Sequence, residues 1–268
     1  MSQSMPPPLF RLLVLCLVLG MGLGGCVRST EGSFSESADK AKAEQAYVRL
    51  GLAYLQEEQY DRARQHLNRA LEINRKSAEA LAGLGLLNQV QGEMEVAEER
   101  FLESIAADGD YTRGRSYYGA FLYGEQRYEE ALEQFEIAAQ DREYDGRPGV
   151  FIKLGRTAQA LGRHDRAAEA YLRALRLDRG NQRALEGALV NLVEAGRFEE
   201  AAPLYERLRM SIRATEAVDH SPATLWAGIR IADYYDDQDR VSSLALLLRK
   251  RYPDSLEYQQ YKAMKAND

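Results

Sequence analysis

Cysteine is almost absent from this chain of 268 residues, which contains only Cys16 and Cys26. Both cysteines lie in the first tenth of the chain. Any fold built from the remaining residues therefore forms without a disulfide and without a thiolate metal site.

Side chains that carry common enzyme chemistry are also few. The three histidines, His66, His164 and His220, form no His-x-x-x-His pair, which argues against a zinc site. The glycines at 20–25 precede no strand, and no phosphate-binding motif or Gly-x-Ser-x-Gly elbow occurs elsewhere. The acidic run at 233–239 lacks the glycine and the distal glutamate of a calcium loop, so we expect an acidic turn there. We therefore expect no catalytic residue, no cofactor and no metal.

The chain also lacks an excess of basic residues. It has 35 lysines and arginines against 41 aspartates and glutamates, a formal net charge of −6. A protein of this charge has no general electrostatic attraction to nucleic acid. Nucleic acid is therefore not an expected partner.

A short apolar segment opens the chain. Arg11 is followed by the apolar run at 12–19 and then by a glycine-rich stretch. The run is too short to span a bilayer comfortably, and the profile is typical of a secretory signal.

The Leu-Gly-Gly-Cys motif at 23–26 resembles the lipobox of bacterial lipoproteins. The resemblance implies that residues 1–25 are removed as a signal peptide and that Cys26 is the lipid attachment site, where two or more acyl chains give stable anchoring. Val27 takes the place of the aspartate associated with inner-membrane retention, which favours the periplasmic face of the outer membrane. An ordinary cleaved signal with an incidental cysteine is the alternative.

Residues 26–39 contain no apolar period, so we expect a flexible lipidated tether there, followed by a folded domain at 40–268.

In that domain, alanines recur at separations of 34, 34, 36 and 34 residues: Ala63, Ala97, Ala131, Ala167 and Ala201. A glycine precedes four of them by twelve residues, at Gly51, Gly85, Gly119 and Gly155. A large side chain follows each alanine by four residues, at Leu67, Phe101, Phe135, Tyr171 and Tyr205.

A fixed period of this length with these residue types resembles the tetratricopeptide repeat (TPR), a pair of antiparallel helices. The small residues belong where two helices cross closely, and the large one fills the groove to the next helix. We therefore predict an all-α fold, a right-handed superhelix of six TPR helix pairs. The predicted repeats are about 44–77, 78–111, 112–145, 148–181, 182–215 and 222–255, with a C-terminal capping helix at 255–264.

Two features depart from the pattern. Repeat six has Ile229 and Val241 where glycine and alanine are expected. Pro203 falls in the second helix of repeat five, near its start, where the first amides have no intrahelical partner and proline is tolerated. Disruption of that helix is the alternative.

The first helix of each TPR pair lines the concave surface, where partners bind. In the first two repeats, the positions expected to face that surface include several apolar residues that the packing pattern does not require. We predict a partner-binding groove formed by Val48, Leu52, Leu55, Leu86 and Val90. Two alternatives are open: the protein's own N-terminal segment, for example Phe34, covers the groove, or the register is shifted by one residue. A basic and aromatic surface in the later repeats, including Arg156 and Trp226, extends the predicted contact.

Six repeats behind a lipobox resemble the outer-membrane lipoproteins of type IV pilus biogenesis, the pilotins of the PilF/PilW type. Residues 116–122, Ser-Tyr-Tyr-Gly-Ala-Phe-Leu, are similar to a characteristic segment of that family, and residues 251–255 are similar to its ending. The resemblance implies a non-enzymatic scaffold that binds secretin subunits, localises them to the outer membrane and promotes their multimer assembly. The alternative is a TPR lipoprotein adaptor for cell-wall synthesis or for a periplasmic protease.

Overall fold

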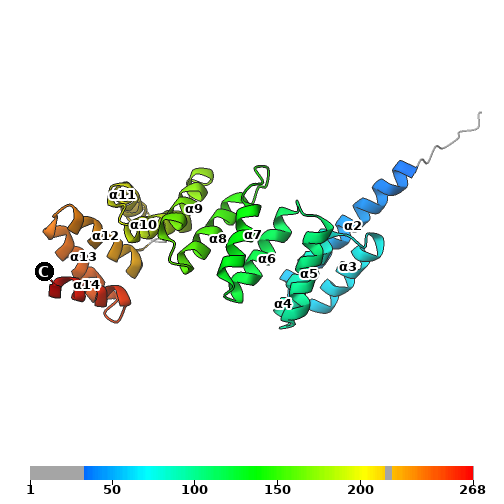
Figure 1. The fold of residues 1–268 in the computed structure, drawn as a ribbon, viewed down its shortest axis with the longest axis horizontal. Coiled ribbons are helices and arrows are strands. Elements are labelled where there is room, and N and C mark those ends of the chain that lie inside the picture. The colour runs from blue at the N-terminus through cyan, green and yellow to red at the C-terminus, as the bar shows by residue number, and fades with distance from the viewer. Residues whose placement is uncertain (1–32, 215–218, 268) are drawn as a thin grey trace, which may run out of the picture. The chain divides into compact units, whose positions relative to one another are not determined.

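The computed structural model describes residues 33–214 and 219–267, which form thirteen α-helices and no strand. The chain divides into two units, residues 1–43 and 44–268. In the larger unit, antiparallel helix pairs follow one another along the stack (Figure 1). The first helices of the six pairs are α2 (Ser33–Gln56), α4 (Ala78–Val90), α6 (Thr112–Gly124), α8 (Arg147–Ala160), α10 (Gln182–Glu194) and α12 (Pro222–Tyr234). The second helices are α3 (Tyr60–Ile73), α5 (Met94–Ala107), α7 (Tyr128–Ala138), α9 (His164–Leu177), α11 (Phe198–Ala214) and α13 (Gln238–Arg251).

The sequence period predicts this arrangement correctly. Each predicted repeat contains one helix pair, and α14 (Leu256–Asn267) follows as the capping helix. Side chains of α14, including Tyr258, Tyr261 and Met264, pack against the buried cluster of repeat six, which contains Ile229 and Val241. The larger residues of this divergent repeat therefore serve the closing contact with the cap.

The N-terminal boundary differs from the prediction. Residues 33–39, expected to belong to a flexible tether, form the first turns of α2. Helix formation here is consistent with the absence of proline and glycine over 33–50 and with an ion pair at i and i+4, in which Lys40 Nζ lies 2.9 Å from a carboxylate oxygen of Glu36. The unit boundary lies between Ala43 and Glu44, where repeat one begins, and residues 26–32 lie outside the described part of the chain.

Within a repeat, the two helices meet at the glycine of the first and the large residue of the second. A Cβ atom added to Gly119 would lie 2.8 Å from Cε1 of Phe135, a ring that is almost completely buried. Gly85 meets Phe101 and Gly155 meets Tyr171 in the same way. The residues that recur in the sequence are thus the ones at which the two helices of each pair cross most closely.

A second set of glycines joins repeats two, five and six to the repeat that precedes each of them. A Cβ on Gly187 would lie 2.6 Å from the ring of Tyr171, and one on Gly228 would lie 2.3 Å from Tyr205. Gly83 approaches Leu67 similarly, at 2.8 Å. Repeat six therefore keeps a small residue toward repeat five, although Ile229 replaces the glycine expected within the pair.

Pro203 lies inside α11, beyond the first four amides of that helix, yet the helix continues to Ala214. The proline is exposed, so water can reach the carbonyl group of Glu199 that its missing N–H leaves without an intrahelical donor. The helix is therefore not disrupted at this position.

The glycine crossing can be tested with a matched pair of substitutions in α6. We expect Gly119→Ala to lower the free energy of unfolding by about 1–3 kcal/mol, because the new methyl group would overlap the Phe135 ring. Gly124→Ala is the control, since a Cβ there has no neighbour within 4 Å. Urea denaturation followed by circular dichroism measures both. Equal stability of the two variants would contradict the role of the crossing.

Candidate functional site

The first helices form the inner face of the stack. The backbones of successive first helices approach one another closely from α4 through α6, α8 and α10 to α12, whereas second helices of neighbouring repeats lie farther apart and meet through long side chains, as in the ion pair between Glu136 of α7 and Arg166 of α9. Because the first helices lie closer together, the stack bends toward them. The inner face is therefore the concave face on which a partner was predicted to bind.

Val48 does not belong to an accessible groove. Its side chain is only 2% exposed and packs with Ala70 and Ala80 in a buried cluster. The small alanines of α3 and α4 leave room for a branched side chain between the helices. The assignment of Val48 to an open apolar surface is therefore wrong, and this residue serves the core of repeats one and two.

The other four predicted groove residues keep some exposed surface. Leu52, Leu55 and Leu86 are half-buried, and each packs partly against a neighbouring buried cluster. Val90, near the C-terminal end of α4, is 55% exposed. Leu52 also approaches α4, because its Cδ2 would lie 3.3 Å from a Cβ on Gly83. The N-terminal part of the inner face thus presents four apolar side chains from two adjacent first helices, Leu52, Leu55, Leu86 and Val90, which we call the apolar patch.

The inner face is hollowed further along, in repeats four to six. A cavity of about 490 Å³ lies among α8, α10 and α12, with Tyr171 of α9 also contributing to its lining. Its lining includes Ile152, Gln159 and Arg156, the last of which the sequence assigned to this face. Burial raises the pKa of Tyr171 to about 12, so its hydroxyl remains a neutral hydrogen-bonding group near neutral pH.

Two arginines of the later repeats, Arg156 and Arg230, lie over aromatic rings and form no ion pair within the described residues. The Arg156 guanidinium lies 5.0 Å from the ring centroid of Tyr123. The Arg230 guanidinium lies 5.4 Å from Phe198 and 5.7 Å from Trp226, which is itself almost completely buried. Such stacked cations keep free donors for an acidic or polar partner group.

Lys153 is a polar residue that the groove prediction did not use. Its ammonium group donates a 2.7 Å hydrogen bond to Ser116 Oγ, and burial lowers the pKa of the lysine. Lys153 occupies the position in repeat four that glycine occupies at Gly83 and Gly187, and its Nζ lies 6.0 Å from the Phe135 ring centroid. It therefore connects α6 to α8 between two repeats.

Repeat five contributes residues that sequence reasoning missed. Arg183, Glu186 and Val190 of α10 line the inner-face cavity, beside Ser221 and Thr224 at the start of repeat six. Arg183, Glu186 and Val190 are the second, fifth and ninth residues of their repeat. The rule that selected the groove residues of repeats one and two, applied to repeat five, would have found them.

Some predicted features lie outside the described part of the chain, among them Cys26 and the side chain of Phe34. Within the described residues, no group of three or more histidine, cysteine, aspartate or glutamate side chains could hold a metal ion. None of the described helices has both the length and the hydropathy needed to cross a membrane. The acidic run at 233–239 contains the predicted turn, and Asp237 accepts a hydrogen bond from the Arg240 amide at the start of α13.

Family models of the tetratricopeptide repeat match residues 44–77 and 152–217. The first match coincides with predicted repeat one. The type IV pilus assembly protein PilF of Pseudomonas aeruginosa is 34% identical over 252 residues, which cover 94% of this chain and 98% of that protein.

Solved structures show the same similarity. A structure of P. aeruginosa PilF aligns with a TM-score of 0.67 and 32% identity, over 84% of this chain and 99% of that one. The crystal structure of PilW, described as a widely conserved type IV pilus biogenesis factor, aligns with a TM-score of 0.59. PilW is 19% identical and covers 81% of this chain and 97% of its own, so its likeness supports the fold alone. Together these matches confirm the predicted all-α TPR fold.

The different burial of Val48 and Val90 can be tested with single cysteines. In the chain with Cys16 and Cys26 changed to serine, we expect Val90→Cys to react with a maleimide reagent on the order of 100-fold faster than Val48→Cys, because a buried thiol reacts only after local opening. Labelling in denaturant gives the reference rate for each variant. Equal rates in the folded protein would show that Val48 is accessible.

Proposed function

The chain belongs to the family of the type IV pilus assembly protein PilF, whose members are TPR scaffolds of type IV pilus biogenesis, and on that premise we propose that it is a pilotin. In this role, it binds secretin subunits in the periplasm, brings them to the outer membrane and promotes their assembly into multimers. It acts by binding protein and not by catalysis.

The apolar patch is the observation that supports a protein partner most directly. Leu52, Leu55, Leu86 and Val90 lie on two adjacent first helices, and the 55% exposure of Val90 is not required by the helix crossings. Apolar side chains gathered on a concave surface commonly mark a protein-binding site. We assign the secretin contact to this patch, without Val48.

The residues farther along the inner face favour an extended contact. Arginine and aromatic side chains, which are enriched at protein interfaces, occur together at Arg156 with Tyr123 and at Arg230 with Phe198, whereas Trp226 is buried and cannot take part in the contact predicted for it. A partner segment that places an apolar side chain on the patch and polar groups near these arginines would match both parts of the face.

The lipobox supports the location proposed for the scaffold. Acylation of Cys26 after removal of residues 1–25 would attach the chain to the periplasmic face of the outer membrane. The helical residues from Ser33 onward would then lie only a few residues from the lipid along the chain. Anchoring on Cys26 would concentrate the inner face where secretin subunits assemble.

The anchor makes a direct prediction. We expect a Cys26→Ser variant to lose labelling by radioactive palmitate and to leave the outer-membrane fraction, because serine has no thiol to acylate. Cys16→Ser is the matched control and should still be labelled, since this residue lies within the predicted signal peptide. Palmitate incorporated into the Cys26→Ser variant would contradict the assignment.

The patch makes the functional prediction. In a deletion strain, we expect secretin to remain monomeric and surface pili to be lost. Complementation with Leu86→Glu or Val90→Glu should restore few multimers, because a charge on the patch opposes apolar contact. Leu102→Glu, on the second helix of the same repeat and 49% exposed, is the control and should restore them fully.

Secretin multimers on a denaturing gel provide the measurement, and circular dichroism shows whether each variant remains helical. Unchanged multimers in the deletion strain would exclude the pilotin role. Altered cell shape or detergent sensitivity with intact pili would instead identify a cell-wall adaptor.

A further inference from the structure

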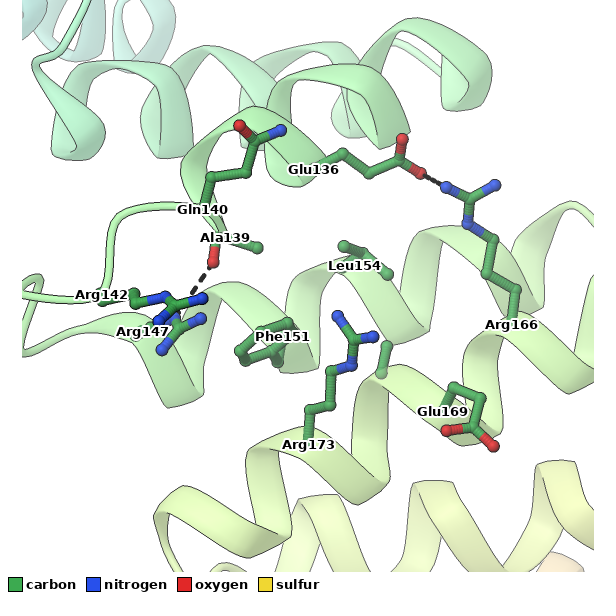
Figure 2. Close-up of a pocket in the computed structure, with 11 residues that line it drawn as sticks. Glu136, Ala139, Gln140, Arg142, Arg147, Phe151, Leu154, Arg166, Glu169 and Arg173 are labelled. Carbon is green, nitrogen blue, oxygen red and sulfur yellow. Dashed lines mark hydrogen bonds and ion pairs between the residues drawn. The ribbon is translucent and has the colours of Figure 1, made fainter.

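A second cavity lies away from the inner face, on the side of the second helices of repeats three and four. Its volume is about 470 Å³, and it is bounded by α7, the connection at 139–146, the start of α8, and α9. Figure 2 shows four arginines around it, Arg142, Arg147, Arg166 and Arg173, with the side chains of Phe151 and Leu154 between them.

The two glutamates of this cavity are already engaged. Glu136 forms an ion pair with Arg166 (Figure 2). An oxygen of Glu169 lies 3.0 Å from Arg197, which belongs to the next repeat. Neither carboxylate is therefore free to neutralise the remaining arginines of the cavity.

Arg142, Arg147 and Arg173 form no ion pair with any carboxylate of the described residues. The nearby Asp141 is held by Thr112, whose hydroxyl donates a 2.6 Å hydrogen bond, and by the Glu143 amide at 3.0 Å. Four arginines against two glutamates leave the cavity with an excess of two positive charges, in a chain whose net charge is −6. The excess is therefore not a property of the chain as a whole, although the cavity between repeats one and two, with three cations and one carboxylate, has a similar excess.

Two of these cations are held in place before any ligand binds. The guanidinium groups of Arg147 and Arg173 lie 5.3 and 5.8 Å from the centroid of the same Phe151 ring. Arg147 Nε also donates a 3.0 Å hydrogen bond to the carbonyl oxygen of Ala139. Side chains fixed in this way lose little conformational entropy when they bind an anion.

The contact region between repeats one and two, which we call a seam, contains a comparable cavity. That cavity has a carboxylate that the cavity between repeats three and four lacks. Its volume is about 400 Å³, and it is lined by three cations, Arg75, Lys76 and Arg100, and by Glu103, an oxygen of which lies 2.6 Å from Arg100. Glu103 and Arg173 are both the twenty-sixth residue of their repeats. Repeat two thus supplies a carboxylate from within the chain at the position where repeat four has a third unpaired arginine.

We propose that the cavity between repeats three and four binds an acidic segment of a partner protein. Carboxylates of that segment pair with Arg142, Arg147 and Arg173. Carboxylates are the groups that this chain itself places against the arginines of its seams.

This site can be tested separately from the apolar patch, since it shares no residue with it. The probe is a fluorescein-labelled, end-capped Glu-Glu-Leu-Glu-Glu peptide, measured by fluorescence anisotropy with the full chain at low and at physiological salt. We expect saturable binding that weakens as salt is added, because the contact is between opposite charges. Lack of saturable binding at low salt would overturn the proposal.

Arg173→Glu is the decisive variant, because it gives repeat four the residue that repeat two has at this position. We expect it to weaken peptide binding at least about tenfold, because it removes one cation and places a like charge against the carboxylates of the peptide. Arg176→Glu makes the same charge change on an exposed residue of the same helix, outside the cavity, and should change affinity less than about twofold. Equal losses of peptide affinity in the two variants would show that binding depends only on the net charge of the chain, which would contradict the proposed site.

Two further measurements separate the alternatives. Arg173→Gln, with circular dichroism of each variant, distinguishes loss of the site from loss of the fold, and it should also weaken binding. Inorganic phosphate and vesicles containing phosphatidylglycerol test whether a phosphate group is the ligand. Binding of either one that depends on Arg173, without binding of the peptide, would overturn the assignment to an acidic protein segment.

Discussion

The structure depends on a large side chain held between two glycines. Tyr171 shows this most fully, because a Cβ on Gly155 of its own repeat would lie 2.9 Å from its ring, and one on Gly187 of the next repeat 2.6 Å. One ring thus sets both the crossing within a helix pair and the distance to the following pair. The exposed positions of α8 and α10, and with them the shape of the inner face, follow from that spacing.

The periodic part of this arrangement could be predicted from the sequence. Alanines at intervals of 34 to 36 residues, each with a glycine twelve residues earlier, report the same crossing in each repeat, so they locate the helix pairs without knowledge of tertiary structure. The start of α2 could not be located in this way. Residues 33–39 carry no repeat signature, and their helical state reflects local propensity and the Glu36–Lys40 pair, which the repeat pattern does not report.

The burial of a side chain was harder to predict than the face of the helix on which it lies. Val48 has the repeat position of a groove residue, but Ala70 and Ala80 are small enough to admit it to the core. The arginine cavity is further beyond sequence reasoning, because Arg142 belongs to an irregular connection and Arg173 to a helix thirty-one residues later. Only packing of the two repeats brings these residues together.

The buried clusters divide the stack into parts of unequal size. A large cluster runs from Ala97 to Ile231, whereas Val48 and Leu67 belong to two small clusters at the N-terminal end. In repeat arrays, terminal units open at lower free energy than central ones. Leu52 and Leu55 pack on those small clusters, so a partner that binds them also stabilises a terminal unit of the array. Folding of repeat one and recognition are therefore thermodynamically linked at the N-terminal end of the stack.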